Sequence, residues 1–112
     1  YAFSYPERLQ STFDRLDFFR NSTLTFEEPD LKRFRNLAFA YEALLQGGNM
    51  ACIVNAANEI VNRAFLEDRV GFLQMSDVIE KVMQQATFIK EPTFDDYLNS
   101  DDEARRIATE CL

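Results

Sequence analysis

The sequence predicts an all-α protein, an antiparallel four-helix bundle preceded by an extended, aromatic-rich arm with a short β segment. After residue 29, apolar residues recur at helical spacing in several segments. Glycine, proline and capping residues separate these segments, as they do between helices. The chain has 112 residues, which is enough for one core. We therefore divide it into an arm, residues 1–29, and a helical bundle, residues 30–112.

The arm is dense in aromatic side chains that follow no helical period. Leu24-Thr25-Phe26 alternates apolar and polar residues, which predicts a short strand. Because a single strand cannot form a sheet, the arm needs a partner surface. Two placements are open: the arm docks on a surface outside these residues, or it wraps onto the helices that follow.

The first helix is predicted to begin at Pro29, since the first helical turn tolerates the missing N–H of proline. It is predicted to end at Gly47-Gly48, where one glycine can take the left-handed position after a helix. One apolar stripe is predicted to form its inner face. This stripe contains Leu31, Phe34, Leu37, Ala38, Tyr41, Leu44 and Leu45.

The second helix is predicted to follow Asn49, a residue type that is favoured as an N-cap. Its inner face is predicted to contain Ile53, Ala56, Ala57, Ile60, Val61, Ala64 and Phe65. Gly71 separates it from a third helix, and Pro92 ends that segment. The inner face of the third helix is predicted to contain Met75, Val78, Ile79, Val82, Met83 and Ala86.

The last segment carries two helix-start signals, Thr93 and Ser100, each followed by acidic residues. We expect a short helical turn at 94–98 and a separate helix over 101–111. Ser100 and Glu103 have the spacing of a capping box for that helix. Its apolar face is predicted to contain Ala104, Ile107, Ala108 and Cys111. Short connections between the helices favour antiparallel neighbours.

Composition excludes several classes of function. The net charge is −7, which argues against a nucleic-acid partner because phosphates attract a basic surface. No apolar run is long enough to span a membrane. The chain has no His, the commonest general base and metal ligand. Its two cysteines fit a reducing compartment, and we expect a cytoplasmic protein.

No segment carries a complete active site, and we predict no catalytic, cofactor-binding or metal-binding residue. Gly47-Gly48 lacks the spacing of a phosphate-binding loop. The acidic cluster could supply oxygen ligands to Mg or Ca, but helix starts already account for carboxylates there and the calcium-loop glycine is missing. That cluster contains Asp95, Asp96, Asp101, Asp102 and Glu103.

Two smaller features remain open. Asn55 and Asn58 lie three residues apart on one helix face, and asparagine is a poor helix former. Either their amides bond to the arm or a neighbouring loop, or they form a ligand-binding pair. Cys52 and Cys111 fit small apolar positions, and Arg105-Arg106 is the one cationic neighbourhood that could activate Cys111.

The chain also resembles a known family, 1-deoxy-D-xylulose 5-phosphate reductoisomerase. The resemblance rests on segment 24–34 (LTFEEPDLKRF), on Gly47-Gly48-Asn49, on segment 54–59 (VNAANE) and on segment 102–108 (DEARRIA). Order and spacing hold across nearly the whole chain. Arg35 and Ala51 stand where the family usually has proline.

The resemblance implies that the chain is the linker and C-terminal helical bundle of such an enzyme, a non-catalytic structural domain. The intact enzyme would convert 1-deoxy-D-xylulose 5-phosphate to 2-C-methyl-D-erythritol 4-phosphate in non-mevalonate isoprenoid biosynthesis. It would use NADPH and a divalent metal (Mg, Mn or Co). The family's cofactor, metal and phosphate residues would precede Tyr1, so no site residue is carried over.

The resemblance also implies partners. These are the remaining domains of the parent enzyme, which we expect to be a homodimer. The isolated chain is predicted to be inactive by itself and to self-associate through its exposed arm. The alternatives are a free-standing helical protein-interaction module and an enzyme in its own right.

Overall fold

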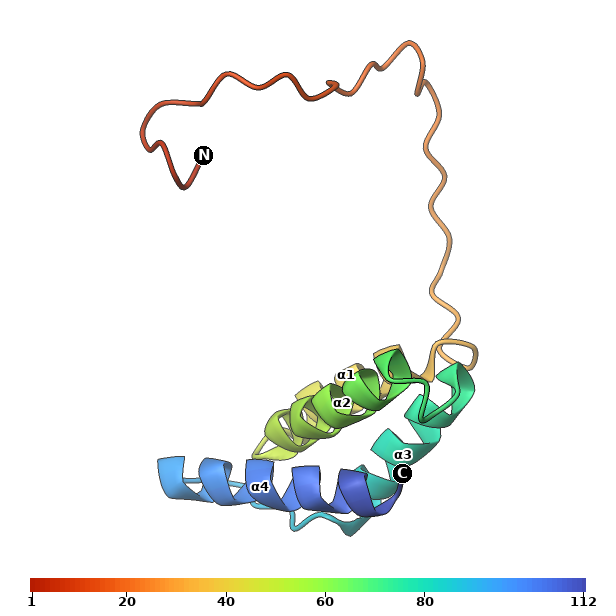
Figure 1. Cartoon of the computed structure of the whole chain (residues 1–112), viewed down its shortest axis with the longest axis vertical. Coiled ribbons are helices and arrows are strands. Elements are labelled where there is room, and N and C mark those ends of the chain that lie inside the picture. The colour runs from red at the N-terminus through yellow and green to blue at the C-terminus, as the bar shows by residue number, and fades with distance from the viewer.

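The computed structural model describes residues 1–112 and contains four helices and no strands. The helices are α1 (Arg35–Gln46), α2 (Met50–Leu66), α3 (Phe72–Gln85) and α4 (Phe94–Glu110). The predicted all-helical class with four helices is confirmed. α1 and α2 lie side by side in opposite directions, and α2 contacts all three other helices (Figure 1).

The core lies where α2 meets α3 and α4. Ile53 and Val61 of α2 and Val82 of α3 are completely buried. Small residues on both α2 and α4 allow these two helices to approach closely. The inner faces predicted for the second and third helices are largely correct, although Phe65 is exposed. The other buried apolar residues here are Ala56, Ala57, Ala64, Met75, Val78, Ile79, Ala104, Ile107 and Ala108.

The inner face predicted for α1 was wrong. Phe39 and Ala43 are the buried residues of this helix, and neither belongs to the predicted stripe. Tyr41, Leu44 and Leu45 are 50%, 76% and 87% exposed. The physical reason is that α1 carries apolar residues on two faces, and only one of them meets the other helices. Periodicity alone does not tell which face is covered.

α1 begins at Arg35, six residues after the predicted start at Pro29. The Asp30 carboxylate accepts hydrogen bonds from the backbone N–H groups of Lys32 and Arg33, both at 3.0 Å. This closes a separate turn before the helix. The Arg35 guanidinium then pairs with Glu80 at 2.8 Å and with Asp77, which joins the start of α1 to α3.

The last segment forms one continuous helix, so the predicted break at 98–101 was wrong. Its capping box is made by Thr93 and Asp96: Asp96 N–H donates to Thr93 Oγ1 at 3.2 Å, and Thr93 N–H donates to Asp96 Oδ2 at 2.8 Å. Ser100 lies inside the helix and is buried. The Glu103 carboxylate does not cap this helix but accepts from Thr87 N–H at 3.1 Å.

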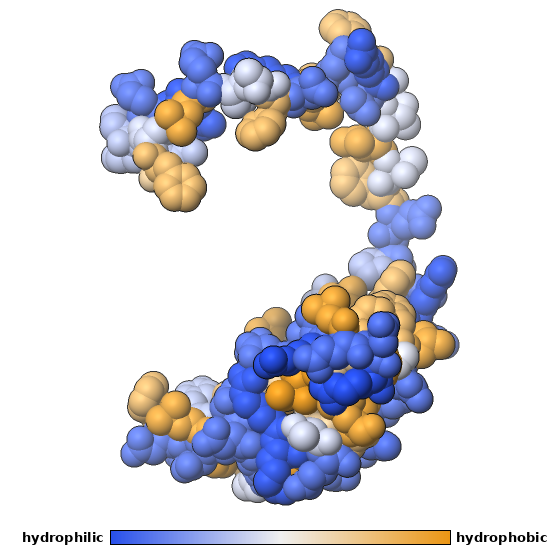
Figure 2. Space-filling view, viewed as in Figure 1, coloured by the Kyte–Doolittle hydropathy of each residue, from blue (hydrophilic) through white to orange (hydrophobic).

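Residues 1–33 contain no helix and no strand, and they extend away from the helices in a long curve (Figure 1). The short β segment expected at 24–26 is absent, because no second strand lies beside it. The arm does not wrap onto the helices (Figure 1), except that Glu28 and Pro29 at its end lie beside α1. Apolar side chains project along it (Figure 2), and Phe3, Phe19 and Phe26 are almost fully exposed. The arm–bundle boundary at 29/30 remains a prediction.

Candidate functional site

The turn between α1 and α2 needs both of its glycines. Gly47 and Gly48 have φ values of 69° and 57°, in the left-handed region that favours glycine. A Cβ on Gly48 would lie 2.3 Å from the carbonyl oxygen of Ile89. The space beside Gly48 is therefore filled by the chain itself, whereas the space beside Gly47 is open. The pair ends a helix, as predicted, and does not form a cradle for a phosphate.

Asn49 is the main polar residue of the interior. The sequence predicted it only as an N-cap and did not predict its bonds to distant parts of the chain. It stands at the N-cap position of α2 but its side chain makes no capping bond. Its Nδ2 donates to the Thr87 carbonyl at 2.9 Å and to Ser100 Oγ at 2.8 Å, and its Oδ1 accepts from Ile89 N–H at 2.9 Å. We call these three bonds the Asn49 network. They join the start of α2 to the α3–α4 connection and to α4.

No sequence signal separates this role from ordinary capping, because the partners are far away in the chain. Asn49 is completely buried, yet its amide is satisfied. Ser100 Oγ also donates to the Asp96 carbonyl at 2.6 Å, inside α4. The network therefore holds the fold together and leaves no polar atom free for a ligand.

Three carboxylates of the predicted acidic cluster, those of Asp96, Asp101 and Glu103, bond to other groups of the fold. Asp96 caps α4, and hydrogen bonds from Thr93 lower the pKa of its carboxyl group. Asp101 pairs with Arg105 at 2.6 Å, and Arg105 reaches Glu59 of α2 at 2.7 Å. These bonds raise the pKa of Arg105. No three His, Cys, Asp or Glu side chains are grouped as metal ligands would be, so the donor set does not fit a divalent ion.

The two cysteines are free and half-buried. Burial raises the pKa of the Cys52 thiol, and the nearby Asp101 carboxylate adds to that shift. The Cys52 thiol donates to the Tyr97 carbonyl at 3.5 Å. Arg106, one of the two cations expected near Cys111, instead pairs with Glu110 at 2.8 Å. The arrangement at Cys52 favours the protonated thiol, which is the unreactive form.

Asn55 and Asn58 bond neither to the arm nor to a loop. The Asn55 amide donates to Glu59 at 3.3 Å, one turn along the same helix. Both asparagines line an open groove of about 520 Å³ between α1 and α2, the largest in the structure. We call it the α1–α2 groove. Its other lining residues are Ala40, Ala43, Leu44, Ala51 and Val54.

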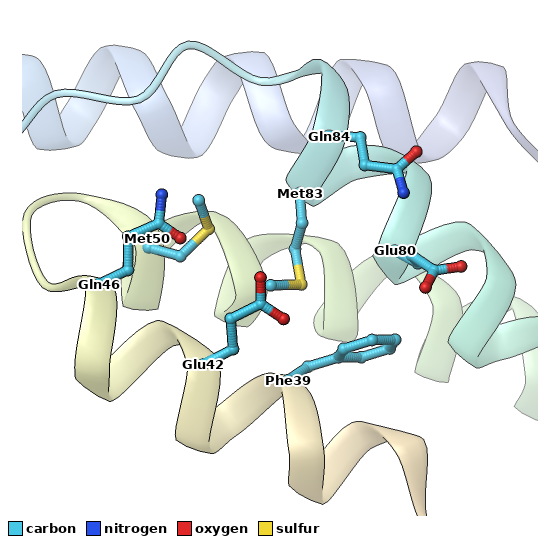
Figure 3. A pocket seen from close by; sticks show the side chains of 7 residues that line it. All are labelled: Phe39, Glu42, Gln46, Met50, Glu80, Met83 and Gln84. Atoms are coloured by element: carbon cyan, nitrogen blue, oxygen red, sulfur yellow. The ribbon is translucent and has the colours of Figure 1, made fainter. Parts of the chain in front are cut away.

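A second cavity, of about 210 Å³, lies where α1 and α3 face each other at the end nearest the glycine turn (Figure 3). Phe39 and Met83 point into it from the two helices, and Met50 lies at one side (Figure 3). Its carboxylates come from Glu42 and Glu80, and Glu80 is already paired with Arg35. No Cys, Ser, Thr or Lys lines this cavity, and three of its seven lining side chains, Phe39, Met50 and Met83, are apolar.

No helix in the structure has both the length and the apolar character needed to cross a membrane. A family model described as "DXP reductoisomerase C-terminal domain" matches residues 1–107. The 1-deoxy-D-xylulose 5-phosphate reductoisomerases of Phocaeicola vulgatus and Acetivibrio thermocellus are 64% and 42% identical over 112 residues. In both cases the whole chain is covered, but only 29% of the relative.

A solved structure gives the same result. The 1-deoxy-D-xylulose 5-phosphate reductoisomerase from Zymomonas mobilis, in complex with NADPH, superposes with a TM-score of 0.79 at 34% identity. The match covers 96% of this chain and 29% of that one. The chain thus spans less than a third of the length of the relatives it matches. These likenesses show that the chain belongs to the family of DXP reductoisomerase C-terminal domains.

Proposed function

We propose that this chain is the C-terminal structural domain of a 1-deoxy-D-xylulose 5-phosphate reductoisomerase, and that it supports the reaction without touching the reacting atoms. The parent enzyme would convert 1-deoxy-D-xylulose 5-phosphate to 2-C-methyl-D-erythritol 4-phosphate. The observation that carries the proposal, beside family membership, is that the interior polar groups are satisfied within the chain. The Asn49 network and the Arg105 ion pairs join helices to one another.

The parent enzyme would use NADPH and a divalent metal, and neither fits the residues of this chain. The glycine pair lacks the spacing of a dinucleotide-binding loop, and the Ile89 carbonyl and the Phe88 ring fill the space beside Gly48. The carboxylates of Asp96, Asp101 and Glu103 bond to neighbouring groups of the fold. We therefore assign hydride transfer and metal binding to other domains of the parent, and no catalytic, cofactor or metal residue to positions 1–112.

The arm, residues 1–29, would serve as a linker that lies on the other domains, and residues 30–112 would form the antiparallel bundle. The support is the exposure of Phe3, Phe19 and Phe26, because aromatic side chains left in water favour a covering surface. By itself the chain would self-associate through this arm. We place the parent in the cytoplasm as a homodimer, and the free cysteines fit that reducing compartment.

The test compares three proteins: the full-length enzyme, the enzyme without residues 30–112, and the isolated chain 1–112. NADPH oxidation is measured with 1-deoxy-D-xylulose 5-phosphate and Mg²⁺. We expect activity only in the full-length enzyme, because the bundle braces a site that it does not contain. Substrate-dependent oxidation by residues 1–112, or tight binding of NADPH or a divalent ion to them, would overturn the proposal.

The exposed arm also fits a second candidate, a free-standing helical module that binds another protein. The coding sequence before Tyr1 distinguishes the enzyme domain from the free-standing module. A continuous reading frame that begins with a glycine-rich nucleotide-binding segment supports the enzyme domain. A start codon close to Tyr1 supports the free-standing module.

A further inference from the structure

α1 has a second apolar face that the bundle does not cover. Leu37, Tyr41, Leu44 and Leu45 follow one another at intervals of four, three and one residues, so they lie on one side of the helix. All four are exposed, and Leu44 and Leu45 are the most exposed of them. We call these residues the outer α1 face. A soluble monomer rarely leaves a contiguous apolar patch of this kind in water.

The α1–α2 groove adjoins this face through Leu44, which belongs to both. No charged side chain lines the groove, although the chain carries a net charge of −7. Ala40 and Ala51 are small, so another backbone can approach closely. The polar groups in the groove are the amides of Asn55 and Asn58, and Asn58 makes no side-chain hydrogen bond within the chain. The surface is therefore apolar, with neutral hydrogen-bonding groups along one edge.

The position of the arm indicates what reaches this surface. Glu28 and Pro29, at the end of the arm, and Leu31, just after it, line a depression of about 360 Å³ together with Tyr41 and Leu45. The polypeptide before α1 thus arrives along the outer α1 face. More than two thirds of the length of the relatives lies outside this chain. A large amount of protein is therefore tethered beside the uncovered surface.

From these observations we propose that the α1–α2 groove and the outer α1 face are the docking surface for the preceding domain of the same polypeptide. This inference rests on the proposed function and adds the face by which the bundle is attached. The docked segment is apolar and uncharged, because a buried charge in this groove would have no partner. It presents backbone or side-chain groups that hydrogen-bond to the two amides.

Thiol labelling tests the proposal in the full-length enzyme. Ala40→Cys places a probe in the groove, and Asn99→Cys, on the exposed surface of α4, is the control. Site-resolved mass spectrometry follows alkylation of each probe in the full-length enzyme and in isolated 1–112. We expect the groove cysteine to react at least about tenfold more slowly in the full-length enzyme, since docking closes it. The control should react equally in both.

Equal rates for the groove cysteine in both proteins would overturn the proposal. So would an equal slowing of groove and control cysteines, because that marks general shielding. If the slow alkylation of the groove cysteine disappears on dilution, a second copy of the protein covers the groove. That result would also overturn the proposal. Protection of the groove cysteine in isolated 1–112 would assign the groove to the arm of the same chain, with the same consequence.

The melting temperatures of a second pair of variants test the docking surface independently. Leu44→Gln changes the proposed surface, and Leu66→Gln changes a leucine of equal exposure at the end of α2, 76% against 77%. Glutamine and leucine have similar helix propensities, so backbone effects are small. Leu44→Gln should lower the Tm of the full-length enzyme and leave that of isolated 1–112 unchanged. Leu66→Gln should change neither.

An unchanged Tm of the full-length Leu44→Gln enzyme, or an equal loss for Leu66→Gln, would refute the docking surface. Neither result would contradict the proposed function, because that function is tested separately by removal of residues 30–112. If that removal leaves full activity, the proposed function fails while the labelling pattern still reports where the bundle is attached.

Discussion

The Asn49 network makes the stability of the bundle depend on one amide, and Asn49→Ala measures that dependence. The substitution removes three side-chain hydrogen bonds from a residue that is completely buried. It leaves the Ile89 N–H and the Thr87 carbonyl without partners, and an unsatisfied buried group costs about 1–3 kcal/mol. We expect the free energy of unfolding to fall by about 3 kcal/mol. This value assumes that water enters the space left by the side chain and partly satisfies the two groups.

For a domain of this size, a loss of 1 kcal/mol lowers the Tm by roughly 4–8 °C. Asn49→Ala should therefore lower the Tm of residues 30–112 by about 12–24 °C. The assay is circular dichroism at increasing temperature and urea concentration, because the chain contains no tryptophan to report on unfolding. Amide hydrogen exchange should also become faster over residues 86–92, the connection that the network holds.

The matched control is Asn62→Ala, at an exposed asparagine in the C-terminal half of α2 that makes no side-chain hydrogen bond. Alanine favours helix more than asparagine does, so this variant should be neutral or slightly more stable. A loss of less than about 1 kcal/mol for Asn49→Ala, or no difference between the two variants, would refute the reasoning, since three net hydrogen bonds exceed that value.

Three further tests, which use five substitutions, address other parts of the fold. Gly48→Ala should destabilise the bundle by more than Gly47→Ala in urea unfolding: both positions have positive φ, but only Gly48 has a backbone oxygen in the way. Asp96 has a lowered pKa, so its contribution is present above its ordinary pKa and is lost as the pH falls through the folded value. Asp96→Asn should flatten the acid limb of the stability–pH curve. Arg105→Lys should lower the free energy of unfolding, measured in urea, by up to about 1 kcal/mol, because lysine lacks the forked guanidinium that binds Asp101 and Glu59 together. Arg106→Lys, in the more exposed pair with Glu110, should leave it almost unchanged.

The inner faces of α2 and α3 could be predicted because each of these helices has one apolar stripe. Ile53, Val61 and Val82 lie on those stripes and are fully buried. α1 could not be predicted in the same way. Its helical pattern is correct, but Phe39 competes with Leu44 and Leu45 for the core, and only the neighbouring helices decide which side is covered.

Local capping signals were reliable for Thr93 and misleading for Ser100. Both residues have an acidic residue three positions later, so the sequence offers two equivalent helix starts. The two residues differ because the buried Asn49, 51 residues away from Ser100, donates a hydrogen bond to Ser100 Oγ. Ser100 therefore lies inside one long helix and does not start a new one. The groove beside Asn55 and Asn58 could not be predicted either, because it exists only where two separate helices meet.

The sequence separations within the Asn49 network also predict an order in which the bundle assembles. Its bonds join residues 38, 40 and 51 positions apart, and contacts of such separation require a large loop to close first. Pairing of α1 with α2 across the glycine turn closes a much shorter loop. We therefore expect the amide bonds to form after the transition state, and the bond to Ser100 to require that α4 is in place. Loss of Asn49 would then accelerate unfolding while leaving the folding rate nearly unchanged, so this side chain governs how long the folded domain persists.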